Sequence, residues 1–193
     1  LAIQDSASDP AAPRRIKWTS EQEMSFEIFE EDKLPTGVMT ITVTNPDGKK
    51  SAQIEKTLAI VPKPTIAELK PPSICDDQAD QTVVIAGSNF LAYDGKTPSV
   101  KVGDKTYAAT FEDKDCAPVE GNFTEKNVKL CSMVTIKIPK GDFPVTATTK
   151  VPVVVTNPAP ADCATSETIE LTINPPPTVD SVVGFVAESG PGI

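Results

Sequence analysis

The residues of this chain best suited to chemistry are its four cysteines, and their spacing predicts disulfide bonds. The 193-residue sequence contains no Cys-x-x-Cys pair and no histidine, whereas zinc sites favour closely spaced thiolates or added imidazoles. Disulfides indicate an oxidising compartment, so we expect a secreted or cell-surface protein, with four reduced core cysteines as the alternative. Cys116 and Cys131 bracket a polar stretch, without expected strands, that a bridge would close, which leaves Cys75 to pair with Cys163. Four cysteines allow three pairings, and we favour this one.

The absence of histidine also restricts enzymatic chemistry to carboxylates. It excludes a Ser-His-Asp triad, a Cys-His pair and a histidine general base. Two acidic clusters could supply a carboxylate pair for glycoside hydrolysis or oxygen ligands for calcium. Neither has the spacing of a dedicated calcium loop, so we interpret both as solvated loops, with calcium as the weaker alternative, and expect a non-enzymatic protein without a metal site or another cofactor. The residues concerned are Asp76, Asp77, Asp80, Glu112, Asp113, Asp115 and Glu120.

Trp18 and Tyr93 are the aromatic residues that we single out as candidate ligand contacts. Trp18 follows two arginines and a lysine on an expected strand, where a core or interface role is the alternative. Tyr93 lies in an expected loop. A carbohydrate-binding platform would require such rings to be exposed and coplanar.

The composition favours many short strands and stiff turns over helices. Hydrophobic residues make up 39% of the chain, aromatic residues only 5%, and 19 prolines are scattered along it, so we expect an all-β protein. A net charge of −9 argues against nucleic acid and anionic membrane surfaces as partners, because binding to either depends on clustered Lys and Arg. No apolar run approaches the roughly 20 residues that a membrane helix requires, so we expect no direct membrane insertion.

One strand-and-turn sequence occurs twice. Residues 43–46 and residues 155–158 both read Val-Thr-Asn-Pro, and the match extends forward through a returning strand with a one-residue change in the turn. The returning strands correspond as well, Leu58 with Leu171 and Ile60 with Ile173. The period is roughly 110 residues, the size of an immunoglobulin-like domain, so the repeat predicts equivalent hairpins in two successive β-sandwiches.

The sequence between the two copies parses into further strands. With the second hairpin they make seven, and Gly103 with Asp104 forms a tight turn between two of them. About four strands are expected before residue 64. The expected strands cover residues 14–18, 23–29, 38–45, 55–61, 64–69, 82–87, 99–102, 105–111 and 128–139.

Three motifs in this order resemble the IPT/TIG family of immunoglobulin-like domains. They are a proline-led first strand (residues 64–72), an apolar strand closing in Gly-x-Asn-Phe (residues 82–90), and the Val-Thr-Asn-Pro turn. The resemblance covers most of residues 64–176 and implies a β-sandwich scaffold that contacts a ligand or matrix through loops or edge strands. Two turns depart from the family pattern, at residues 76–81 and at residues 159–160.

The Gly-x-Asn-Phe residues have structural interpretations. We expect Gly87 to permit a bulge or a close approach of two strands, Asn89 to cap a turn through its own backbone, and Phe90 to fill one end of the core.

We therefore expect a partial immunoglobulin-like domain (residues 1–63) that lacks its first strands, a complete one (residues 64–176), and a linker with the first strand of a following domain (residues 177–193). Residues 178–185 have the pattern of that first strand. The simplest explanation is a piece of a longer tandem array. The alternative is that the strand of one molecule completes the partial domain of the next.

These expectations describe an extracellular, bacterial, non-enzymatic spacer and adhesion module. Its partners would be neighbouring immunoglobulin-like domains of the same chain, other copies of itself, or a surface glycan or protein ligand. Two alternatives stay open: a self-assembling filament subunit and a carbohydrate-binding module accessory to a glycan-active enzyme. The DNA-binding relatives of this fold are a poor guide here because the chain is acidic.

Overall fold

The computed structural model describes residues 16–20, 22–28, 32–44, 48, 57–75, 79–165, 167–179 and 181. These residues form strands and short 3-10 segments but no α-helix, which confirms the expected all-β class. None of them belongs to a helix that is long and apolar enough to span a membrane. The chain forms two compact units, Leu1–Pro62 with Glu120–Thr124, and Lys63–Val119 with Glu125–Ile193.

The first unit contains two antiparallel hairpins. Strand β1 (Ile16–Ser20) pairs with β2 (Glu23–Phe26), and β3 (Gly37–Thr40) pairs with β4 (Thr57–Ile60). The four strands expected in this region are therefore present, each at or near its expected place.

The second unit contains two larger sheets. Their orders are β10-β11-β7-β5 and β6-β13-β12-β8-β9, and all neighbours are antiparallel except β6 and β13. The strands are β5 (Thr65–Lys70), β6 (Ser73–Cys75), β7 (Gln81–Ala92), β8 (Ser99–Val102), β9 (Lys105–Ala108), β10 (Cys116–Pro118), β11 (Lys129–Ile138), β12 (Thr149–Thr156) and β13 (Ile169–Asn174); the 3-10 helix η2 is Asp113–Asp115.

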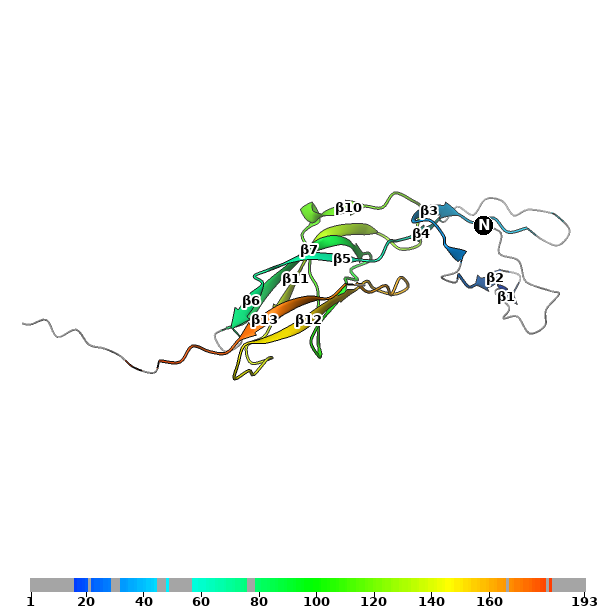
Figure 1. Ribbon diagram of the computed structural model, residues 1–193. Helices are drawn as coiled ribbons and strands as arrows, with labels where there is room; N and C mark the ends of the chain where they lie inside the picture. The colour runs from blue at the N-terminus through cyan, green and yellow to red at the C-terminus, as the bar shows by residue number, and fades with distance from the viewer. Residues whose placement is uncertain are drawn as a thin grey trace, which may run out of the picture. The chain divides into compact units, whose positions relative to one another are not determined.

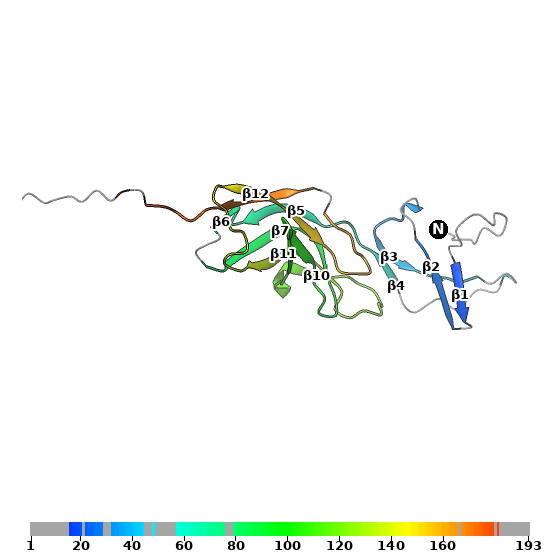
Figure 2. The ribbon, with the colours of Figure 1, turned by 90° about the horizontal axis from the view of Figure 1, so that it is seen from below.

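Both sheets of the second unit contribute to one hydrophobic core. Alternate residues of each strand point inward, as the period of two in a strand requires; on β7, for example, Val83 and Ile85 are buried. Figures 1 and 2 show β7 and β11 in one layer and β12 in the other. The fully buried side chains include Ile85, Phe90, Val100, Val102, Ile136, Ile138, Val153, Val155, Leu171 and Ile173.

The sequence repeat is also a repeat of structure. Met39 lies opposite Leu58 in the first unit, and their counterparts Val151 and Leu171 lie opposite each other in the second. The other three pairs of the β3–β4 hairpin correspond to pairs of the β12–β13 hairpin in the same way. The two hairpins belong to different sheets and different units.

Gly87 lies where two strands approach each other closely. It is opposite Ile66 of β5, whose register shifts at this point, and a Cβ atom on Gly87 would lie 1.9 Å from the Thr65 carbonyl oxygen. The expected close approach is confirmed, and Phe90 is fully buried as expected. The expectation for Asn89 is wrong, because its side-chain amide donates to the Lys63 carbonyl at 3.1 Å instead of capping its own turn.

Two short strands were not expected, and one of them contradicts the interpretation of residues 116–131 as strandless. β10 lies at the start of that stretch because it pairs with the first residues of β11, a partner far along the chain. β6 forms in the same way beside β13. Most of the strand expected over residues 178–185 lies outside the described residues; Thr178, Val179 and Ser181 are described and are not in a strand.

Candidate functional site

The disulfide between Cys116 and Cys131 is present, as expected. The two residues lie directly opposite each other on β10 and β11, and the sulfur atoms are 2.05 Å apart. The bond ties the ends of the polar loop that connects the two strands. It therefore fixes where this loop leaves and rejoins the four-stranded sheet.

The second expected disulfide is wrong, because Cys75 and Cys163 are free thiols. Cys75 is opposite Asn174 at the end of β13, beside the start of β12. The carbonyl of Cys163 accepts a hydrogen bond from the N–H of Asn157, which follows the other end of β12. Eight residues of β12 separate these places, or roughly 25 Å at the rise of a strand. A disulfide requires Cα atoms within about 7 Å.

The structure separates the two candidate aromatic ligand contacts. Trp18 is 66% exposed and lies opposite Met24, which is 41% exposed, on one face of the β1–β2 hairpin. Tyr93 is only 5% exposed, so the interpretation of its ring as a stacking platform is wrong. A bridge to Lys96 folds the chain back at this point, and the Lys96 ammonium lies 5.2 Å from the ring centroid.

The acidic clusters do not form a metal site among the residues that the structure describes. Asp76 and Asp77 lie outside those residues. The Asp80 carboxylate accepts a hydrogen bond from the backbone N–H of Lys140 at 3.1 Å. In the second cluster, the Asp113 carboxylate pairs with the Lys129 ammonium at 2.6 Å.

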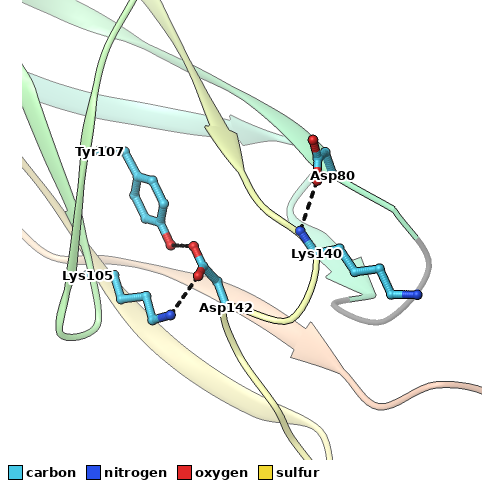
Figure 3. Close-up of polar contacts among 5 residues, drawn as sticks. All are labelled: Asp80, Lys105, Tyr107, Lys140 and Asp142. Carbon is cyan, nitrogen blue, oxygen red and sulfur yellow. Dashed lines mark hydrogen bonds and ion pairs between the residues drawn. The ribbon is translucent and has the colours of Figure 1, made fainter.

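Asp142 forms a polar cluster that sequence reasoning missed. Figure 3 shows its carboxylate between Tyr107 and Lys105. The Tyr107 hydroxyl and the Lys105 ammonium each donate to it at 2.7 Å. These bonds, that of Lys105 first and that of Tyr107 second, lower the pKa of Asp142 below its usual range. They hold the loop that follows β11 against the β8–β9 hairpin, which is a structural role.

Asn157 is the one buried polar residue among those that the structure describes, 1% exposed. Its side-chain oxygen accepts from the Leu91 N–H, and its side-chain nitrogen donates to the Asn89 carbonyl, both at 2.9 Å. It therefore joins the end of β12 in one sheet to the end of β7 in the other. Its place in the repeated Val-Thr-Asn-Pro sequence was the signal that could have identified it, since the first copy carries Asn45 there.

A groove of about 410 Å³ lies between the edge strand β9 and the outer edge of β11. The bridge between Thr110 and Thr135 joins the two edges at one point. A second hollow of about 200 Å³ also reaches Thr135 and is lined by Val84, Phe111 and Met133 among others. The residues that line the larger groove include Thr82, Thr106, Ala108, Thr110, Thr135 and Lys137.

Comparison of the chain with family models, with curated proteins and with solved structures finds no match.

Proposed function

We propose that this chain is a non-enzymatic spacer and adhesion segment of a bacterial secreted or cell-surface protein, built from tandem immunoglobulin-like units of the IPT/TIG type. The observation that carries the proposal is the hairpin that occurs with the same register in two separate units. A repeat of a structural hairpin, and not of a binding or catalytic site, is what a scaffold in series requires.

The arrangement of the second unit supports an immunoglobulin-like sandwich. Its two mainly antiparallel sheets bury their inner faces in one core. The chain crosses from one sheet to the other between β5 and β6, and the last strand, β13, lies beside β6. The Cys116–Cys131 disulfide supports the extracellular part of the proposal, because such bonds persist in oxidising compartments.

The positions of the first and last strands suit a unit that bears tension. β6 and β13 are parallel, with Ser73 opposite Thr172 and Cys75 opposite Asn174. The second unit begins before β5 and ends after β13, and only residues 120–124 between them belong to the first unit. Tension between the two ends of the chain therefore acts along β6 and β13 in opposite directions and loads their hydrogen bonds together.

Single-molecule pulling on the full chain, held at its two ends, tests this proposal. We expect the second unit to unfold in one step. Reduction of the disulfide should lengthen that step by roughly 50 Å, because the bond removes 15 residues of separation from the extended chain. Several small steps without a discrete event would contradict the proposed spacer.

A different pulling direction is the matched control. Cys75 and Asn174 lie opposite each other at the same end of the strand pair. Pulling between the Cys75 thiol and the end of the chain after β13, in a Cys163→Ser variant, opens the hydrogen bonds one at a time. We expect a lower unfolding force in this direction, and equal forces in both directions would contradict the proposal.

Carbohydrate binding is a second candidate function, favoured by the exposure of Trp18. If the β1–β2 hairpin binds a glycan, Trp18→Ala should abolish glycan-array binding, whereas Lys17→Ala on the opposite face of the same strand should not. Absence of binding by the unmodified chain would eliminate this candidate.

A further inference from the structure

The loop that the Cys116–Cys131 disulfide closes carries a motif that the proposed function does not use. Residues 120–124 read Glu-Gly-Asn-Phe-Thr, so Asn122 is followed by a phenylalanine and then by a threonine. Asn-x-Ser/Thr, where x is not proline, is the sequence in which an asparagine accepts an N-linked glycan. The other five asparagines of the chain have no serine or threonine two positions later.

An acidic residue also precedes this asparagine at the position that bacterial transferases recognise. Glu120 lies two residues before Asn122. Bacterial oligosaccharyltransferases require Asp or Glu at this position, where the carboxylate can form a charge-assisted pair with a basic residue of the enzyme; their eukaryotic counterparts do not. The five-residue pattern is therefore the one expected of a secreted bacterial protein, and the inference rests on the bacterial and extracellular parts of the proposed function.

The three residues that such a transferase recognises are accessible. Glu120, Asn122 and Thr124 are all exposed, and residues 119–128 form neither strand nor helix. A transferase must draw the acceptor segment into its active site, away from the rest of the substrate protein. An exposed irregular loop permits this movement, whereas a strand inside a sheet does not.

Backbone bonds on both sides confine this movement to the loop. The Val119 N–H donates to the Val128 carbonyl at 2.9 Å. The Lys126 N–H donates to the Asp94 carboxylate at 2.8 Å, and the Asp94 N–H donates to the Lys126 carbonyl at 2.9 Å. We call these two places the fixed points of the loop. Residues 120–125 lie between them and can leave the surface while the fixed points stay bonded.

The backbone of Asn122 makes one contact that the transferase would have to open. Its carbonyl accepts a hydrogen bond from the Thr57 N–H at 3.0 Å. Exchange of a neutral hydrogen bond for one to water has a small net cost, because water replaces the lost partner. The disulfide holds the ends of the loop in place meanwhile. Modification is therefore compatible with the folded chain.

We propose that Asn122 is the acceptor of an N-linked glycan, transferred from an oligosaccharide that is linked to a lipid diphosphate. The side-chain nitrogen of Asn122 forms a bond to the anomeric carbon of the sugar. The bond between that carbon and the diphosphate oxygen breaks, and the lipid diphosphate leaves with the electron pair. The amide proton passes to a carboxylate of the transferase. The loop then carries a bulky, solubilising group at the surface.

Transfer in vitro to the folded full chain tests this site. The chain is incubated, without reductant, with a purified bacterial oligosaccharyltransferase and a lipid-diphosphate oligosaccharide, and is then reduced and digested with trypsin. Cleavage after Lys114 and Lys126 releases residues 115–126, in which Asn122 is the only asparagine. We expect this peptide to gain the mass of the oligosaccharide, as measured by mass spectrometry.

Three exposed positions give variants that separate the parts of the motif. Asn122→Gln removes the acceptor and should abolish transfer. Thr124→Ala should lower the rate about tenfold or more, since a hydrogen bond to the enzyme is lost, whereas Thr124→Ser should preserve it. Glu120→Gln should lower the rate of a bacterial transferase about tenfold or more, because a charge-assisted bond is lost. The same variant should leave transfer by a eukaryotic transferase unchanged, which distinguishes the two kinds of enzyme.

Lys129→Thr is the matched control for the geometry of the loop. It gives Asn127 a threonine two positions later, and Glu125 already lies two positions before it. Asn127 lies between the fixed points of the loop and not in the segment that can leave the surface. We expect the folded variant to be modified at Asn122 and at least about tenfold less at Asn127, and a synthetic peptide of its residues 115–133 to be modified at both.

Three results would overturn the proposal. The unmodified chain could gain no glycan while a synthetic peptide of residues 115–126 is modified, which would mean that the folded loop is closed to the enzyme. The peptide could also fail, which would make the motif a chance match. Equal modification of Asn122 and Asn127 in folded Lys129→Thr would overturn the geometry that selects Asn122. Single-molecule pulling requires no glycan, so this proposal and the spacer function can fail separately.

Discussion

Replacing Asn157 by alanine should destabilise the second unit more than any other single loss of a polar side chain among those described above. The change leaves the Leu91 N–H and the Asn89 carbonyl without their partner, and Leu91 is buried. An orphaned buried group costs about 1–3 kcal/mol. We therefore expect a loss of about 2–4 kcal/mol in the free energy of unfolding, since Asn89 is only half-buried and water can reach its carbonyl.

Urea unfolding followed by far-UV circular dichroism measures this loss. The midpoint should fall while the slope of the free energy against urea stays unchanged, as expected for a loss of stability without a change in compactness. Asn174→Ala is the matched control, because that side chain makes one exposed bond, to the Thr148 hydroxyl. It should cost less than about 1 kcal/mol. A loss below about 1 kcal/mol for Asn157→Ala would refute the role assigned to Asn157.

The Asn157→Asp variant tests the two hydrogen bonds while it keeps the size and shape of the side chain nearly unchanged. A carboxylate can still accept from the Leu91 N–H, but it faces the Asn89 carbonyl without a proton to donate. Burial and this carbonyl both raise the pKa of the introduced acid. A raised pKa in the folded state means that the folded chain binds more protons, so stability should increase as pH falls from 7 toward 5. Equal stability at both pH values would contradict the two-bond geometry.

Three further predictions concern the disulfide, the close strand contact and the Asp142 cluster. Replacing Cys116 and Cys131 together by serine should cost about 3 kcal/mol in urea unfolding, because their separation is 15 residues; unchanged stability would contradict this. Gly87→Ala should cost more than about 2 kcal/mol by the same measurement, since a backbone carbonyl oxygen lies 1.9 Å from the new Cβ, and a neutral result would mean that the strands do not approach as described. Tyr107→Phe should raise the pKa of Asp142 toward its ordinary value of 3.8, measured by NMR titration. In the unmodified chain the stabilising effect of this carboxylate should be complete above pH 3.8 and disappear as pH falls through its lower folded-state pKa; an unchanged pKa in the variant would contradict the assigned hydrogen bond.

The local sequence was sufficient to predict strands whose own residues show an alternating apolar pattern and a turn at the end. Residues 99–102 were expected as a strand and form β8, because alternating valines and the following Gly103 define both its faces and its end. β10 could not be predicted in this way, since Cys116–Pro118 becomes a strand only through its pairing with the start of β11. Short strands of this kind depend on a distant partner.

The site residues likewise include some that local sequence could predict and others whose positions depend on distant contacts. The Cys116–Cys131 bond was predictable because both residues bracket one loop. The position of Cys163 was not, because it depends on which end of β12 the chain reaches after its turn. Tyr93 looked exposed because it follows a strand, yet it is only 5% exposed and the chain folds back on it through a bridge to Lys96. The roles of Asn157 and Asp142 depend on contacts with strands 35 or more residues away.

The disulfide across β10 and β11 has a consequence for sequence variation. Because Cys116 and Cys131 fix both ends of their loop, a longer loop would add little entropy cost and would not disturb the strands that it connects. The backbone of Lys126 is held in both directions by Asp94, so inserted sequence should be tolerated best just before it, at the exposed Thr124 and Glu125. Evolution, or a designer grafting a foreign peptide, can change what this loop displays while the sheets beneath it stay the same.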